Sequence, residues 1–244
     1  MLNEDNCSKP YLMLSFIIGL IFNVGTVEAK TNYNALHYNH DIIAKYENGG
    51  MGYKTISKDN YGGYSYGKWQ ISTERRNGKK STFDFFMLFV EKSDYSLFKK
   101  LENAGGQPAA FKGDKKFIDT WNKLAQNKKF QKLYDEFLLK EQIIPVYKRM
   151  DNSKNIKLDI ITTWASSNNA IQAAIKSTIV QHGSGGAYGM IRNIVDIYNP
   201  KTKGEFLKRL YEYRAVRFPK YERRYKAEYA ELNEYLNTKA AKLA

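Results

Sequence analysis

The chain has 244 residues and a formal net charge of +14, with 43% hydrophobic and 14% aromatic residues. This length allows one large domain or two small ones, and the aromatic content favours an ordered protein over a disordered one. The positive charge favours polyanionic partners, namely nucleic acid, anionic lipid or a cell-wall glycan. Cys7 is the only cysteine, which excludes a disulfide framework within the chain.

The N-terminal segment has the layout of an export signal. An apolar run over residues 11–27 follows Lys9, and a small-residue cleavage site follows the run and ends at Ala29. Cleavage after Ala29 would remove Cys7, raise the net charge to +16, and leave residues 30–244 as a single periplasmic or secreted domain. The acidic residues at positions 4 and 5 are atypical for a signal peptide, so a membrane anchor formed by residues 11–27 is the alternative.

The mature part is predicted to begin with a helix followed by a glycine-rich hairpin. Residues 35–46 contain no glycine or proline and place apolar side chains on one helical face. Glu47 then precedes Asn-Gly-Gly, a sequence that stops helices. Residues 48–72 combine aromatic and β-branched residues with glycines and predict a loop and a short hairpin. Strand alternation predicts Ser65, Gly67 and Trp69 on one side of this hairpin and Tyr66, Lys68 and Gln70 on the other.

The rest of the first half is predicted to be mostly helical. A basic turn over residues 73–80 is placed to flank a groove, and Ser81 then begins a helix with a capping-box pattern. Further helices are predicted over residues 95–102 and 115–125, with a loop over 105–113 between them. Another is predicted from Phe130 onward, with a kink near Pro145. A polar turn over 150–154 is the candidate boundary between two lobes.

The second half is predicted to be helical throughout. One apolar helix ends at His182-Gly183, and a later one stops at Asn199-Pro200. The predicted helices cover residues 156–166, 169–181, 190–198, 203–218 and 219–236.

Three separated motifs carry a resemblance to a known family. The first motif has two parts, which read Y-E-x-G-G-x-G at residues 46–52 and G-G-x-S-Y-G-x-W-Q-I-S at residues 62–72. They resemble the bacterial and phage peptidoglycan hydrolases with a lysozyme-like, chitosanase-related fold, among them the muramidase domains of type VI secretion spike proteins. Further matches lie at residues 164–183 and 206–232. The resemblance implies a mainly α, lysozyme-like α+β fold with two helical lobes and a small β-hairpin at the active-site cleft.

Glu47 and Asp59 are the expected catalytic residues. Cleavage of a glycosidic bond needs one protonated carboxyl group and one carboxylate. Burial at the end of an apolar helix would raise the pKa of Glu47, and the resemblance places Glu47 on the catalytic glutamate of the family. In the relatives the second carboxylate usually stands two residues before the Gly-Gly pair, which is Asn60 here, so Asp59 would act through a shifted loop. The alternatives are a turn-forming Asp-Asn pair and a lytic transglycosylase that uses Glu47 alone.

The other expected site residues line or support the cleft. Ser65, Tyr66, Trp69 and Gln70 are expected to bind substrate or to support the hairpin. Gln181 and His182 belong to the family's V-Q-H-G motif and are expected to order the cleft floor. Tyr211 to Arg214 and Arg224-Tyr225 also match family elements, and a buried arginine is expected to pair with a carboxylate such as Glu228.

The predicted function is an exported N-acetylmuramidase that hydrolyses peptidoglycan glycan strands with inversion. No cofactor or metal is implied, and the membrane is expected to be contacted only through the signal segment. The strong positive charge favours anionic peptidoglycan over cationic chitosan. No nucleic-acid-binding signature is present, and a secretion apparatus or a cognate inhibitor remains open as a partner. The alternative from another class is an inactive, basic cell-wall-binding module.

Overall fold

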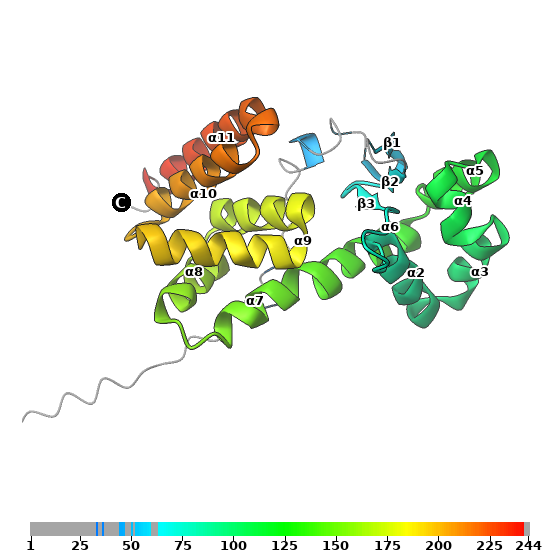
Figure 1. The fold of residues 1–244 in the computed structure, drawn as a ribbon, viewed down its shortest axis with the longest axis horizontal. Helices are drawn as coiled ribbons and strands as arrows, with labels where there is room; N and C mark the ends of the chain where they lie inside the picture. The colour runs from blue at the N-terminus through cyan, green and yellow to red at the C-terminus, as the bar shows by residue number, and fades with distance from the viewer. Residues whose placement is uncertain are drawn as a thin grey trace, which may run out of the picture.

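The chain forms two lobes joined by one long helical segment. This computed structural model describes Tyr33, Leu36, residues 44–46, Gly50, and residues 52–59 and 63–241. The first lobe, here called the sheet lobe, contains a small sheet and helices α2 to α6, and the second, the helical lobe, contains α7 to α11 (Figure 1). The predicted mainly helical architecture with two lobes is confirmed.

The sheet is a three-stranded antiparallel meander. A short 3₁₀ turn, η2 (Gly52–Lys54), leads into β1 (Ile56–Lys58), and β2 (Tyr64–Tyr66) and β3 (Ile71–Ser72) follow in the order β1-β2-β3. The predicted hairpin is therefore present with an additional strand. Ser65 pairs with Ser72 across β2 and β3, which brings two hydroxyl-bearing residues side by side.

The alternation predicted for residues 65–70 ends at Tyr66. Residues 67–70 form a turn, with Gly67 at φ +78° and Gln70 at φ +49°. The predicted sides of Lys68, Trp69 and Gln70 are therefore wrong, because the pleat that fixes the side of each residue exists only in a strand. The left-handed turn is the reason that Gly67 is needed in the sequence.

The helices of the sheet lobe follow the sequence signals with one exception. Ser81 caps the first of them in a full capping box, as predicted. The predicted loop over residues 105–113 is instead largely helical, because Gly105 starts the helix in a left-handed conformation and Pro108 lies in the first turn, where a missing N–H is harmless. These helices are α2 (Thr82–Ser93), α3 (Tyr95–Asn103), α4 (Gly106–Lys112), α5 (Lys115–Leu124) and α6 (Lys128–Phe137).

An aromatic core holds the sheet against these helices. The ring of Tyr66 lies 5.1 Å from that of Trp121 and 5.5 Å from that of Phe83, measured between centroids. The hydroxyl group of Tyr134 donates to the carbonyl of Tyr66 at 2.8 Å and accepts from the backbone N–H of Trp69 at 3.1 Å. These contacts fix the turn after β2 to the centre of the lobe.

One continuous helical segment joins the lobes. It consists of α6, the π-helical segment η3 (Leu138–Ile143) and α7 (Ile144–Asp151), and in Figure 1 it runs diagonally from beside the sheet to the lower edge of the helical lobe. The kink predicted near Pro145 corresponds to η3. This segment ends at Ile143, and Pro145 lies in the first turn of α7. The predicted boundary at 150–154 is wrong, because this turn joins α7 to α8 inside the helical lobe.

Helix α9 is the core of the helical lobe. Both of its halves are largely buried, and its first half carries small residues such as Ala170, Ala173 and Ala174 that allow close helix packing. The helix is broken at Gly183 (φ +71°, ψ 166°) and ends at Asn199, both as predicted. The elements around it are α8 (Ile156–Ser167), α9 (Asn169–Tyr198), α10 (Lys203–Arg217), the 3₁₀ turn η4 (Pro219–Tyr221) and α11 (Glu222–Ala241).

No helix in the described part of the chain combines the length and the apolar character that a membrane span requires. The predicted signal peptide over residues 1–29 lies outside the described residues. The signal and its anchor alternative therefore stay predictions.

Candidate active site

A cleft of about 830 Å³ lies between the two lobes. The sheet lobe contributes β3 and the loop that follows it, η3 forms part of the floor, and the helical lobe contributes the break in α9 and the start of α11. The described lining residues are Asp59, Ser65, Trp69, Gln70, Ile71, Ser72, Glu74, Arg76, Lys79, Lys80, Ser81, Thr82, Leu138, Gln142, Ile179, Val180, Gln181, His182, Gly183, Gly185, Lys220, Tyr221 and Arg224.

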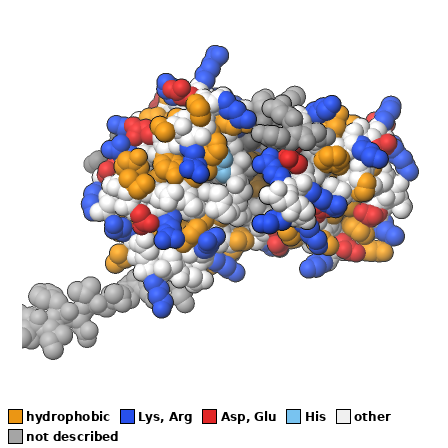
Figure 2. All heavy atoms as spheres, viewed as in Figure 1, with side chains coloured by type: hydrophobic (Ala, Val, Ile, Leu, Met, Phe, Trp, Pro, Cys, Tyr) orange, Lys and Arg blue, Asp and Glu red, His pale blue; other side chains and the backbone are white. Residues whose placement is uncertain are grey.

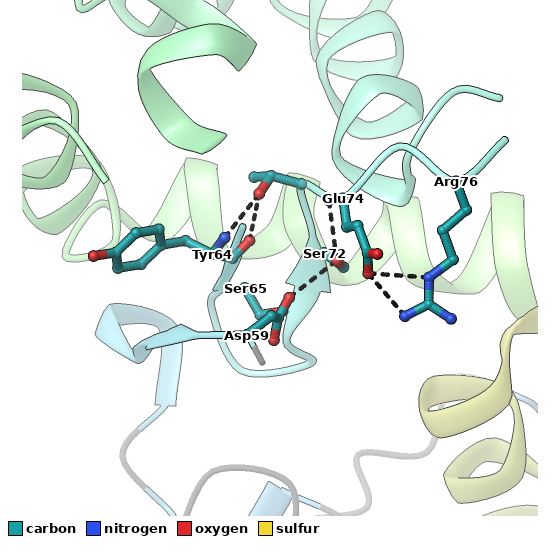
Figure 3. A network of polar contacts seen from close by, with 7 residues as sticks. Asp59, Tyr64, Ser65, Ser72, Glu74 and Arg76 are labelled. Atoms are coloured by element: carbon teal, nitrogen blue, oxygen red, sulfur yellow. Dashed lines mark hydrogen bonds and ion pairs between the residues drawn. The ribbon is translucent and has the colours of Figure 1, made fainter. Parts of the chain in front are cut away.

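Asp59 is held in this cleft by two serine hydroxyl groups. Ser65 Oγ and Ser72 Oγ donate to the same oxygen, Oδ2, at 2.9 and 3.1 Å (Figure 3). The backbone N–H of Asp59 donates to the carbonyl of Gly63 at 2.8 Å and closes the β1–β2 connection. Three neighbouring strands therefore fix one oxygen of the carboxylate, while no hydrogen bond within the described part of the chain occupies Oδ1. Such a carboxylate can accept a proton from a water molecule in the cleft.

A second carboxylate, Glu74, also lines the cleft. Its Oε2 accepts from Arg76 Nε at 3.0 Å and from Nη2 at 2.8 Å (Figure 3). The backbone N–H of Glu74 donates to the Oγ of Ser72, the same atom that donates to Asp59. The sequence motifs missed Glu74 and the role of Ser72, because their position depends on the pairing of β3 with β2.

Two residues at the break in α9 form the opposite wall. Gln181 Oε1 accepts from Arg214 Nη2 at 2.7 Å and from the hydroxyl group of Tyr225 at 2.9 Å. The imidazole of His182 stacks on the ring of Phe218, with 4.3 Å between centroids, and its Nε2 lies 3.4 Å from the hydroxyl group of Tyr225. Gln181 is thus braced by α10 and α11, and His182 by α11 and the residue that follows α10.

His182 is a neutral brace at physiological pH. Burial, followed by the nearby charges of Arg214, Arg224 and Arg217, lowers the pKa of His182 to about 3. A neutral imidazole lacks the acidic proton of the imidazolium form, and its location beside three cations makes it a poor proton acceptor. The structure is consistent with the predicted ordering role of His182 and argues against direct acid–base catalysis.

A buried charge cluster lies behind this wall. The side chains of Arg214 and Glu228 are both fully buried, and Arg214 Nη2 lies 3.9 Å from Glu228 Oε2. Arg224, which lines the cleft, places its Nε 3.8 Å from the same oxygen. The sequence predicted this pairing. Burying these ions is costly, and the mutual neutralisation offsets that cost.

Two of the expected substrate contacts are part of the framework. Tyr66 is fully buried, its hydroxyl group donates to the carbonyl of Ala110 at 2.8 Å, and it does not line the cleft. The expectation that Tyr66 contacts substrate is therefore wrong, because the side chain fills the aromatic core. Trp69 borders the cleft but is only 2% exposed, and its Nε1 donates to Asp135 at 3.0 Å, so it offers no open ring face to a sugar.

The remaining expected residues do meet at the cleft. Ser65, Gln70, Gln181 and His182 all line it together with Asp59. Gln70 is held by its own turn, where its Nε2 donates to the carbonyl of Gly67 at 2.9 Å and its Oε1 accepts from Ser57. Glu47 lies outside the described residues, so its role stays a prediction.

The cleft is electropositive and polar. Its described lining includes five cationic side chains against two carboxylates, and Lys and Arg side chains surround the hollow between the lobes (Figure 2). Within the described residues, no three His, Cys, Asp or Glu side chains gather as a metal site would require. The arrangement suits a polar substrate with negative charge.

Residues 40–240 match the family described as "Type VI secretion system spike protein VgrG3-like, C-terminal". No curated protein sequence matches the chain.

Solved chitosanase structures are similar to this fold. The chain is similar to the structure titled "co-crystal structure of chitosanase OU01 with substrate", with a TM-score of 0.52 and 15% identity over 75% of this chain and 76% of that one. A structure titled "Chitosanase complex structure" has a TM-score of 0.49 and 15% identity over 75% and 77% of the two chains. The first similarity shows that the fold is chitosanase-like.

Proposed function

Because the chain belongs to the VgrG3-like C-terminal family of type VI secretion spike proteins, we propose that it is an exported peptidoglycan hydrolase of the N-acetylmuramidase type. Glu47 is the proposed general acid and Asp59 the proposed general base. The observation that carries this proposal is the Asp59 carboxylate, which two serine hydroxyl groups hold in a cleft with a chitosanase-like fold around it.

The proposed reaction is a single displacement at the anomeric carbon. Glu47 gives its proton to the oxygen of the glycosidic bond as that bond breaks, and Asp59 takes a proton from the water molecule that attacks the anomeric carbon from the other face. The product has inverted configuration, and Glu47 is left ionised while Asp59 is protonated. Proton exchange with solvent restores both groups.

The charge of the protein supports peptidoglycan over chitosan as the substrate. Chitosan is a polycation, and a chain with a net charge of +14 repels it at long range. Peptidoglycan carries carboxylates, so the same field raises its local concentration near the cleft. The neutral cleft residues Ser65, Gln70 and Ser72 then offer hydrogen-bonding groups to the sugar.

Purified sacculi test this proposal directly. Incubation with the protein should release muropeptides with muramic acid at the reducing end, identified by mass spectrometry. Fragments with 1,6-anhydro ends would show a transglycosylase, glucosamine at the reducing end would show a glucosaminidase, and binding without release would show a cell-wall-binding module.

Carboxamide variants test the proposed residues. Glu47→Gln and Asp59→Asn should each lower the rate at least about 100-fold, because each removes a proton-transfer group. Glu74→Gln is the matched control, since Glu74 is a cleft carboxylate that pairs with Arg76. If Glu74→Gln abolished cleavage and Asp59→Asn did not, Asp59 would lose the role of base.

The export route stays a prediction that a simple measurement checks. We propose cleavage after Ala29, with a secretion apparatus and a cognate inhibitor as further partners of the exported protein. N-terminal sequencing of the protein recovered from the periplasm or medium should begin at Lys30. An intact N-terminus in the membrane fraction would instead favour the anchor formed by residues 11–27.

A further inference from the structure

Cationic side chains border the cleft on both lobes. The loop after β3 contributes Arg76, Lys79 and Lys80, the α10–α11 connection contributes Lys220, and the start of α11 contributes Arg224. Figure 2 shows Lys and Arg side chains on either side of the hollow. A polymer that lies in the cleft therefore passes between two positively charged rims.

The loop of the sheet lobe is anchored so that its lysines remain at the cleft. Arg75 is bound through Nε at 2.8 Å and Nη2 at 2.5 Å to Asp84, the carboxylate of the α2 capping box. The backbone N–H of Lys79 donates to the carbonyl of Arg76 at 3.0 Å and closes a turn. Arg75 thus ties the loop to α2, while Lys79 and Lys80 line the cleft.

Three of the five cations have no acidic partner among the residues that the structure describes. Arg76 pairs with Glu74, and Arg224 lies beside Glu228. Lys79, Lys80 and Lys220 are exposed and form no ion pair within the part of the chain that the structure describes. Their charge is available to a ligand.

The floor and the rims meet different parts of a glycan. The part of the cleft near Asp59 carries hydroxyl and amide groups such as those of Ser72 and Gln70, which suit the neutral sugar rings. The exposed lysines lie at the edges, where they reach groups that project from the rings. In peptidoglycan these groups are the peptides, which have free carboxylates at their ends and along their length.

We propose that Lys79, Lys80 and Lys220 bind the carboxylates of the peptides on the glycan strand and make the enzyme selective for peptide-bearing strands. This inference rests on the proposed hydrolase function and adds a specificity determinant to it. Exposed ion pairs are individually weak, so three of them together should change kcat/KM about 10-fold, with the effect falling as salt is added.

The test uses two forms of one substrate. The first form is uncross-linked, peptide-bearing glycan strands, and the second is the same strands after their carboxylates have been converted to methylamides with a carbodiimide and excess methylamine. The purified protein should form new reducing ends about 10-fold faster on the first form at low ionic strength. The triple variant Lys79→Gln, Lys80→Gln, Lys220→Gln should cleave both forms at the slower rate.

A control variant separates local from general charge. Lys100→Gln, Lys112→Gln, Lys123→Gln removes three exposed charges from α3, α4 and α5, away from the cleft, and should keep the preference. The inference is overturned if the unchanged protein cleaves both forms equally, if the rim variant keeps the preference, or if the control variant loses it equally. If the unchanged protein cleaves neither form, the proposed function fails, and this inference with it.

Discussion

Replacing Gly67 with alanine should destabilise the sheet lobe far more than a usual glycine substitution. Gly67 has φ +78°, and a Cβ atom there would lie 2.6 Å from Cζ of Tyr134 and 2.7 Å from its hydroxyl oxygen. Tyr134 is 1% exposed, and its hydroxyl group bonds to the backbone of Trp69 and of Tyr66. The ring therefore cannot move aside without breaking both hydrogen bonds.

The size of the effect follows from three contributions. The left-handed conformation costs an alanine about 1 kcal/mol. Overpacking against a buried ring costs about 1–3 kcal/mol, and each of the two hydrogen bonds that is lost costs about 1 kcal/mol. We expect Gly67→Ala to lower the free energy of unfolding by about 4–6 kcal/mol.

Gly78 offers a matched control in the same lobe. It has φ +71°, but a Cβ atom there would have no neighbour within 4 Å. Gly78→Ala should therefore cost only the conformational part, about 1 kcal/mol. The difference between the two variants isolates the contact with Tyr134.

Urea denaturation followed by tryptophan fluorescence measures both variants. With a slope of about 2–3 kcal/mol/M, Gly67→Ala should shift the midpoint by about 1.3–3 M and Gly78→Ala by no more than about 0.5 M. Equal shifts for the two variants would refute the reasoning, because they would show that the Tyr134 ring yields without cost.

Three further variants test the electrostatics of the cleft and its supports. Ser72→Ala should lower kcat about 10-fold with little change in KM, because Asp59 loses one of its two hydroxyl donors. Ser96→Ala is the control, since it removes a hydroxyl group that donates to Asp94, and it should not affect the rate. The pKa of His182 is lowered to about 3, so below about pH 6.5 the unfolded state binds a proton that the folded state does not. The free energy of unfolding therefore falls by up to about 1.4 kcal/mol for each pH unit below this value. His182→Gln should flatten that slope, measured by urea titrations between pH 6.5 and 5. Hydrogen bonds from the guanidinium group of Arg75 lower the pKa of Asp84 to about 2. The contribution of Asp84 to stability is therefore full above about pH 4 and is lost as the pH falls through 2. Asp84→Asn should lower the free energy of unfolding by about 2 kcal/mol at pH 7 and by much less at pH 2.

Helix ends were the part of the fold that local sequence predicted best. Ser81 begins a helix and Asn199 ends one, as expected, because each makes its capping contact with a residue no more than four positions away in the chain. The same local reasoning failed at residues 105–113, where glycine and proline indicated a loop. These residues are compatible with a helix start, and contacts of α4 with its neighbours decided between the two.

The site could be predicted only where a motif names its residues directly. Ser65 is a fixed position of the motif at residues 62–72, Asp59 lies in the loop just before it, and the structure places them in hydrogen-bonding contact. Ser72 and Glu74 gain their positions from the pairing of β3 with β2, and Tyr66 is withdrawn into the core by rings from distant helices. Pairing and burial of this kind are long-range, and a single sequence does not specify them.

The arginine charges that help to keep His182 neutral also support the proposed preference for an anionic substrate. Burial is the largest contribution to its low pKa, and the charges of Arg214, Arg224 and Arg217 add to it. Within the described residues, Glu228 is the one buried carboxylate among these arginines, so it compensates only part of their charge. The helical wall of the cleft is therefore electropositive before any exposed lysine is counted, and the same field that keeps a proton off His182 attracts a carboxylate-bearing strand.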